Sequence, residues 1–393
     1  MTVIQFRRND RPTIGVEIEL GLVDGQTMEL TSAFGQVADE LQRRATPPAP
    51  LAGEKQSDDR YVVDDQLGLK PELMQSVVEV VTGVCHTVGE AEADLRGKVA
   101  RVQAACDKLG LGLWWGATHP FSRWSEQQVT PTDRYQGLVD HLQEMARRLV
   151  TFGMHVHVGV DTGDKAVMIC DRIMRYLPVL LAISSSSPFW EGRNTGLHSH
   201  RSKVMEGLPT AGLPTLMRNW SEYVWLVNHM IDTGFINSIR EIWWDVRPHH
   251  NFGTVEVRVC DMPGNLDDVL AIAAMVQCLV QALSEDIDQG AYQHDCHPMM
   301  VRQNKWRATR YGVTAQLVDS YTYEVLSVAD VVDGMVERLL PIADRLGCVA
   351  ALERCRSLAR GPSSATRQLE LVESGTSLVE MTRELTEQSR LDA

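Results

Sequence analysis

The sequence predicts an α+β protein built on one largely antiparallel sheet, with helices packed on one face of that sheet. Short runs in which apolar and polar residues alternate, as in strands, are interspersed with longer segments that have helical spacing of apolar residues. These segments do not follow the regular β-α-β order that would indicate a parallel sheet. Such an architecture leaves the second face of the sheet free, and the residues on that face are the candidates for function.

The individual elements follow from these two periodicities. Strands are expected over six short segments: 14–23, 61–69, 76–82, 111–117, 153–160 and 253–260. Helices are expected over seven segments, of which 164–186 is the most apolar: 33–44, 89–109, 133–150, 164–186, 266–287, 325–347 and 367–390. Residues 45–60 hold three prolines, a glycine and a charged run, so they predict a surface loop and a candidate lid.

Composition and charge exclude several classes of function. The chain has 38 Lys and Arg against 52 Asp and Glu, a formal net charge of −14. Binding to nucleic acid depends on clustered cations, so this balance argues against a nucleic-acid partner. The first residues lack the apolar run of a signal peptide, and no run of about 18 apolar residues indicates a membrane span. We therefore expect a cytoplasmic protein.

The eight cysteines are scattered without C-x-x-C pairs, which is typical of reduced thiols. The closest cluster of soft metal ligands is His294, Cys296 and His297 in QHDCH. Three ligands without a fourth partner are more typical of a surface or oligomer segment than of a metal site.

Three predicted strands carry a pair of reactive residues on their polar side. Side chains two positions apart share one face of a strand. The three pairs are Glu17 and Glu19, His155 and His157, and Glu256 and Arg258. Each pair alone has an ordinary explanation: a solvated acidic face, hydrogen-bonded imidazoles, or a cross-strand ion pair.

The recurrence of such pairs favours a shared site. If the three strands belong to one sheet, its polar face suits Mg²⁺ or Mn²⁺ held by carboxylates and bridging phosphate oxygens, with Arg neutralising the charge that moves. Nucleotide chemistry is then the leading interpretation. The sequence contains no Walker motif, no G-x-G-x-x-G turn and no His-Glu-x-x-His, which removes the usual support for P-loop, dinucleotide and zincin enzymes.

Two further stretches are candidates for the same site. Glu79 lies in a β-branched run that predicts a buried strand, where a carboxylate needs a partner. Trp243 and Trp244 precede Arg247, His249 and His250, and this stretch fits either a site for a nucleotide or acidic substrate or a half-buried tryptophan pair in the core.

Eight motifs occur in a fixed order: GVEIEL (15–20), PELMQSVVEVVTG (71–83), GMHVHVGV (153–160), SSSPFWEGRNTG (185–196), HRS (200–202), LPTAG (208–212), WWDVRP (243–248) and FGTVEVRVCD (252–261). In this combination the chain resembles the glutamate–cysteine ligases of type 2, the bacterial carboxylate–amine ligase branch. The resemblance implies a glutamine-synthetase-like fold, in which a curved, mainly antiparallel sheet forms a funnel with helices on its outer face. It also implies a single catalytic domain over 1–393, with a core at about 13–290 and a helical portion at about 291–393.

The resemblance further implies an activity. An enzyme of this kind uses ATP and Mg²⁺, with Mn²⁺ as an alternative ion, to activate the γ-carboxylate of glutamate as an acyl phosphate. The amine of cysteine, or of a related amino acid, then attacks and releases phosphate. The implied partners are small amino-acid substrates and a second copy of the chain in a homodimer, without nucleic acid or membrane.

Residue roles are carried over position by position. The implied metal ligands are Glu17, Glu19, Glu72, Glu79, His155 and Glu256. The residues expected to contact ATP phosphates or substrate carboxylate are Arg258, Arg247 and Arg201, and the expected catalytic residues are Arg258, Glu256 and His157. Leu197 and His200 stand where relatives commonly have tyrosines near a substrate-facing loop, which leaves the amine open.

Two other functions remain alternatives. A metal-dependent phosphotransferase or ATPase would use the same face on a small acid without forming an amide. A non-catalytic relative would bind nucleotide without turnover.

Overall fold

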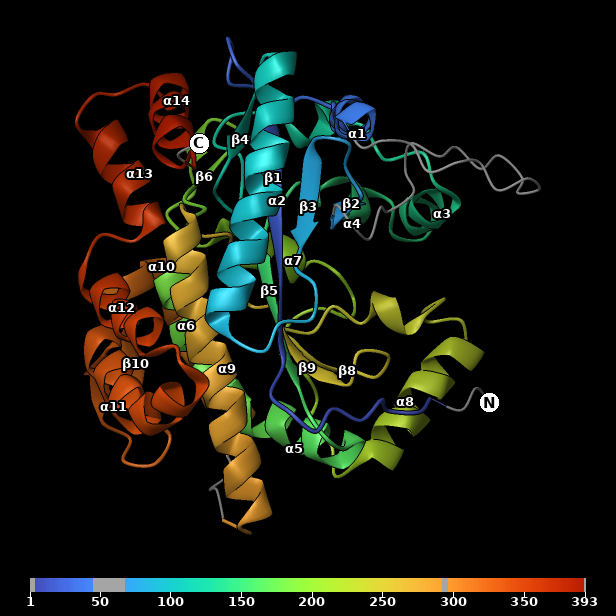
Figure 1. The fold of residues 1–393 in the computed structure, drawn as a ribbon, viewed down its shortest axis with the longest axis vertical. Coiled ribbons are helices and arrows are strands. Elements are labelled where there is room, and N and C mark those ends of the chain that lie inside the picture. The colour runs from blue at the N-terminus through green and yellow to red at the C-terminus, as the bar shows by residue number, and fades with distance from the viewer. Residues whose placement is uncertain (1–3, 45–67, 292–295, 392–393) are drawn as a thin grey trace.

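The computed structural model describes residues 4–44, 68–291 and 296–391, and a seven-stranded sheet forms its centre (Figure 1). The strand order is β2-β3-β1-β5-β9-β8, with β4 paired to the end of β1, and every pairing is antiparallel. The strands are β1 (Ile14–Asp24), β2 (Leu69–Pro71), β3 (Val77–Val81), β4 (Leu111–Trp114), β5 (Met154–Gly159), β8 (Val246–His249) and β9 (Thr254–Val257). The predicted α+β class and its mainly antiparallel sheet are confirmed.

The apolar face of the sheet is covered by helices α2 (Val88–Leu109), α5 (Gly163–Ile173) and α9 (Leu266–Asp288). Two of these, α2 and α9, cross in front of the sheet in Figure 1. The strands have a valine-rich side because alternate residues, such as Val16, Val156 and Val255, are fully buried beneath these helices. Helix α9 is long and apolar enough to cross a membrane, but 83% of its most apolar window is buried inside the protein. It is therefore a core helix.

The remaining helices surround this core. They are α1 (Phe34–Arg44), α3 (Asp133–Leu142), α4 (Glu144–Arg147), α6 (Leu177–Ser184), α7 (His200–Met205), α8 (Trp220–Asp232), α10 (Pro298–Tyr311), α11 (Val328–Leu346), α12 (Val349–Arg360), α13 (Ser364–Glu373) and α14 (Leu378–Gln388). Two small hairpins accompany them: β6 (Phe189–Trp190) with β7 (Arg193–Asn194), and β10 (Gln316–Val318) with β11 (Val325–Ser327). The helices from α10 onward gather along one side of the molecule in Figure 1. The division into a catalytic core and a helical portion stays a prediction.

Three predicted helices are interrupted, each for a local reason. The helix expected at 133–150 breaks at Gln143, which has a left-handed backbone (φ 50°). The one at 164–186 divides at a 3₁₀ turn, Met174–Tyr176, and Pro178 lies in the first turn of α6, where its missing N–H costs nothing. The one at 367–390 divides between α13 and α14, around Gly375 with φ 101°.

Several elements of the structure were not predicted, and two predicted segments cannot be compared with it. The helices α7, α8, α10 and α12 and the strand β8 lie outside the predicted helices and strands. The candidate lid at 45–60 and most of the strand expected at 61–69 lie outside the described residues.

Candidate active site

A cavity of about 650 Å³ lies over the polar face of the sheet. Its walls come from the sheet, from β2 and the residues after it, from α3, from α7 and from the segment 239–252. All ten predicted site residues line it: Glu17, Glu19, Glu72, Glu79, His155, His157, Arg201, Arg247, Glu256 and Arg258. The structure therefore brings together residues that are up to 241 positions apart (17 to 258) in the chain.

The register between strands produces this convergence. Glu17 lies opposite His155 across β1 and β5, and its carboxylate is 3.2 Å from the Nδ1 of that ring. His157 lies opposite Glu256 across β5 and β9, with its Nε2 3.6 Å from Glu17 Oε1. On the other side of β1, Glu19 lies opposite Glu79 of β3. Cross-strand pairs on one face bring side chains into contact, so each strand extends the polar surface of its neighbour.

The acidic side of the cavity holds more negative charge than its surroundings neutralise. Burial and the neighbouring Glu72 raise the pKa of Glu19 to about 7. Burial, followed by repulsion from Glu17 and Glu72, raises the pKa of Glu79 well above its usual value. Lys70 is a neighbouring cation, with its Nζ 3.9 Å from Glu79 Oε2. A site of this kind gains stability from an added cation.

The opposite side of the cavity is built around Glu256, which is only 1% exposed. The guanidinium of Arg247 donates to both of its oxygens, at 2.7 and 3.1 Å, and Arg258 donates to one of them. Although burial alone would raise the pKa of Glu256, Arg247 and Arg258 hold it well below its usual value. Glu256 is shielded from solvent because the guanidinium groups of Arg247 and Arg258 cover it. Glu256 and Arg258 do form an ion pair, but the partner of Glu256 across the strands is Arg247 of β8.

Two groups of side chains have donor atoms close enough to share one metal ion. The first group is Glu17, His155 and Glu256, and the second is Glu19, Glu79 and His155; within each, the donor atoms lie within 4.8 Å of one another. The buried Nε2 of His155 has no hydrogen-bond partner within residues 4–44, 68–291 and 296–391. Burial and the charge of Arg258 lower the pKa of this ring to about 4, so it is neutral at pH 7 and able to donate a lone pair. Mostly oxygen donors with one imidazole fit Mg²⁺ or Mn²⁺.

The two tryptophans at 243–244 lie in different environments, so each of the two alternatives describes one of them. Trp243 lines the cavity, whereas Trp244 packs with Tyr223 in a separate apolar cluster. Near Trp243, the rings of His249 and Phe252 stack at 4.2 Å, and His157 meets both at right angles.

Some predicted features lie away from the cavity, and some of its residues were missed. Neither Leu197 nor His200 is among the residues that line it. His297 caps α10 by accepting from Met299 N, and His294 lies outside the described residues. The residues missed include Lys70, which pairs with Glu79 in register, and Arg134 and Tyr135 on α3, for which the sequence gives no signal.

Comparison with solved structures shows the class of fold. A glutamate–cysteine ligase from Francisella tularensis, solved in complex with AMP, superposes with a TM-score of 0.69 at 12% identity, over 98% of this chain and 90% of that one. A bifunctional glutathione synthetase from Pasteurella multocida gives a TM-score of 0.67 at 14% identity, over 96% of this chain and 52% of that one. The fold is the predicted glutamine-synthetase-like ligase fold.

Sequence comparison then shows the family. The model of glutamate–cysteine ligase family 2 (GCS2) matches residues 13–387. A relative from Gloeobacter violaceus, named "Putative glutamate–cysteine ligase 2", is 38% identical over 382 residues, covering 97% of this chain and 98% of the relative. One from Frankia alni, named "Putative glutamate–cysteine ligase 2-1", is 43% identical over 365 residues, covering 93% and 91%. The chain belongs to glutamate–cysteine ligase family 2, and it is an ATP-dependent carboxylate–amine ligase that acts on small amino-acid substrates.

Proposed function

We propose that this ligase joins the γ-carboxylate of glutamate to the amino group of cysteine, as the names of its relatives suggest. The carboxylate oxygen attacks the γ-phosphorus of ATP and ADP leaves. The amine nitrogen then attacks the acyl carbon, loses a proton, and phosphate leaves. The observation that carries the proposal is the cavity in which buried carboxylates, a neutral imidazole and three guanidinium groups converge.

The charge distribution of the cavity supports different roles for its basic and its acidic residues. Arg258 and Arg247 flank Glu256 and would bind and orient phosphate oxygens, with Arg201 at the wall of the same cavity. Glu17, Glu19, Glu79, His155 and Glu256 would hold one or more Mg²⁺ ions, with Glu72 as a further acidic ligand. Mg²⁺ bound there would neutralise phosphate charge as the phosphoryl group moves. His157 would contact substrate or nucleotide beside Glu17.

We also propose that the ligase is cytoplasmic and that it forms a homodimer. All eight cysteines are free thiols, and seven of them are buried, which suits a reducing compartment. Sedimentation analysis would test the dimer, and a monomer at micromolar concentration would contradict it.

The decisive experiment measures ADP release and product masses with ATP and Mg²⁺ across pairs of amino acids. We expect a γ-glutamyl amide whose formation requires both glutamate and cysteine. A product formed with another amine would support the ligase activity and identify a different acceptor. ADP release that is indifferent to the amine would favour the phosphotransferase or ATPase alternative, and nucleotide binding without turnover would favour the non-catalytic one.

A further inference from the structure

Arg201 lies at the wall of the cavity in an unusually confined position. Its side chain is only 4% exposed, yet it belongs to the lining. The guanidinium lies directly against Gly153: a Cβ at that position would be 2.2 Å from Arg201 Nη2, so only glycine allows this approach. Gly153 N–H in turn donates to Glu19 at 2.6 Å. Arg201 is thus placed behind the acidic side of the cavity.

The hydrogen bonds of Arg201 leave part of its guanidinium unsatisfied. Nη2 donates to the carbonyl of Arg258 at 3.3 Å, and Nη1 donates to that of Val259 at 3.5 Å. Nε is buried and has no hydrogen-bond partner among the described residues. The Oδ1 of Asp261 lies 4.0 Å from Nη1 and provides a counterion. A buried cation with weak contacts of this kind retains the capacity to bind an anion.

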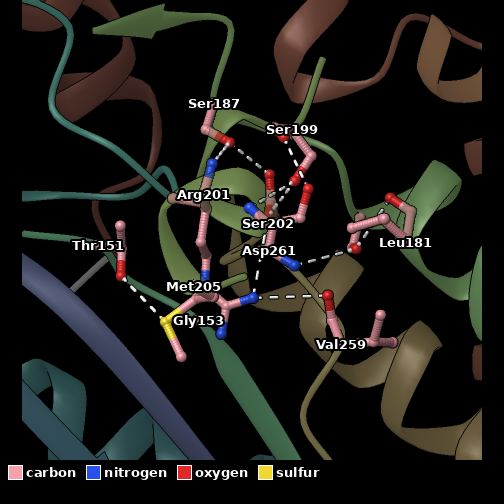
Figure 2. A network of polar contacts seen from close by, with 12 residues as sticks. Thr151, Gly153, Leu181, Ser187, Ser199, Arg201, Ser202, Met205, Val259 and Asp261 are labelled. Atoms are coloured by element: carbon pink, nitrogen blue, oxygen red, sulfur yellow. Dashed lines mark hydrogen bonds and ion pairs between the residues drawn. The ribbon is translucent and has the colours of Figure 1, made fainter. Parts of the chain in front are cut away.

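Asp261 is fully buried and is not among the residues that line the cavity. Its carboxylate accepts hydrogen bonds from Ser187 Oγ at 2.7 Å, Ser199 Oγ at 2.8 Å and Ser186 N at 3.0 Å. Figure 2 shows this carboxylate between the two serine hydroxyls and the guanidinium of Arg201.

The same hydroxyls hold the beginning of helix α7, on which Arg201 lies. Ser187 Oγ accepts from the backbone N–H of Arg201 at 3.1 Å, and Ser199 is the N-cap of the helix. Asp261 therefore fixes Arg201 in two ways: through the backbone, by way of the serines, and through charge, at the guanidinium.

We propose that Asp261 is a positioning residue that holds the Arg201 guanidinium at the cavity wall, ready to bind an anionic group of a ligand. The chemistry of that group is a carboxylate or a phosphate, supplied by the amino-acid substrate or by the nucleotide. The inference rests on the proposed function only in so far as the cavity binds such ligands. Asp261 acts through Arg201 and does not touch the ligand.

A double-mutant cycle in ligand affinity tests this role. Calorimetry measures the dissociation constants of L-glutamate and, separately, of a non-hydrolysable ATP analogue with Mg²⁺. The proteins are the wild type, Asp261→Asn, Arg201→Met and the double variant, and Glu40→Gln is the control. Glu40 is a buried carboxylate on α1 that pairs at 2.9 Å with Lys108, which is 55% exposed. Glu40→Gln therefore controls for the loss of a buried carboxylate that does not line the cavity.

We expect Asp261→Asn to weaken one of the two ligands by about tenfold, as for the loss of one charge-assisted contact. Arg201→Met weakens the same ligand at least as much, and the double variant is no weaker than Arg201→Met alone. Which ligand responds identifies the source of the anionic group. Glu40→Gln binds both ligands like the wild type.

Three outcomes would overturn the inference: additive losses in the double variant, wild-type affinity in Asp261→Asn, or wild-type affinity for both ligands in Arg201→Met. If Asp261→Asn does not fold, Ser187→Ala removes one link of the same network and should weaken the same ligand to a smaller extent. Unchanged affinity in Ser187→Ala would then overturn the inference.

The test is separable from that of the proposed function. Coupled losses of affinity without amide formation by the wild type would contradict the proposed function alone. Amide formation with additive losses would contradict the role of Asp261 alone.

Discussion

Glu256 shows how one residue serves both the stability of the fold and the chemistry of the cavity. It is buried between Arg247 and Arg258, and removing one partner from a buried ion pair leaves an uncompensated charge. We expect Glu256→Gln to abolish ADP formation and to lower the free energy of unfolding by about 3 kcal/mol. Denaturant unfolding checks this against Glu222→Gln, whose partner Arg218 is exposed and whose loss should cost less than about 1 kcal/mol. Equal costs would show that Glu256 is not held as an ion.

The raised pKa of Glu19 predicts that metal binding depends on pH. Burial and Glu72 raise its pKa to about 7 from an ordinary 4.5, so the folded protein keeps a proton that the unfolded chain has lost. The stability that this proton provides is present at low pH and is lost as the pH rises through about 7. A divalent cation competes with the same proton, so Mn²⁺ should bind about tenfold more tightly at about pH 8 than at about pH 6.

Calorimetric titration with Mn²⁺ at the two pH values measures this effect. Glu19→Gln serves as the comparison, because it removes this proton and should reduce the change in affinity between the two pH values. Glu79 and Glu72, whose pKa values burial also raises, account for the change that remains. His155 does not add to the dependence, since its pKa is lowered to about 4 by burial and Arg258. An affinity of the wild type that is flat over this range would contradict the raised pKa of Glu19.

At the scale of the element, two glycines should respond to alanine in opposite directions. Gly97 lies within helix α2, where an added Cβ meets nothing within 4 Å, so Gly97→Ala should raise stability by about 0.5–1 kcal/mol. At Gly153, next to β5, an added Cβ would lie 2.2 Å from Arg201 Nη2, so Gly153→Ala must displace that side chain and should lower both stability and ligand affinity. Thermal unfolding of both variants checks the prediction, which fails if both shift the midpoint the same way.

The strands also show what could be predicted from sequence and what could not. The alternation of Glu17 with Glu19, and of His155 with His157, predicts which residues share a face, because side chains alternate along any strand. The register that places Glu19 opposite Glu79 depends on pairing between segments about 60 residues apart, and alternation within one strand does not specify it. Arg134 and Tyr135 reach the cavity from a helix whose pattern is that of any amphipathic surface helix, so they carried no signal.

At the scale of the molecule, Lys305 connects the helices after residue 296 to the cavity. This lysine of α10 is 3% exposed and pairs with Glu206 at 2.9 Å and Asp245 at 2.6 Å. The carbonyl of Asp245 accepts from Arg258 N–H, so the contact reaches Arg258, one of the predicted phosphate contacts, just after the end of β9. We expect Lys305→Met to cost about 3 kcal/mol of stability and to reduce ADP formation.

Lys203→Met is the matched comparison, because Lys203 also pairs with Glu206 but is 32% exposed. Its loss should cost less than about 1 kcal/mol. Denaturant unfolding and ADP release on both variants measure the difference, and similar costs would mean that the buried pair does not hold the two parts together. The motifs that carry the family resemblance end at residue 261, so they could not predict this contact.

Helix α9 has a consequence for how the chain is made. The last strand of the central sheet, β9, ends at Val257, and α9, which covers much of the apolar face, begins at Leu266 and ends at Asp288. A ribosome needs roughly two to six seconds to add the residues from 258 to 288. During that interval the nascent sheet exposes a valine-rich face and the new helix exposes its own apolar surface. Chaperone binding to the emerging chain should therefore peak within this window, and a pause in translation there should lower the yield of folded ligase.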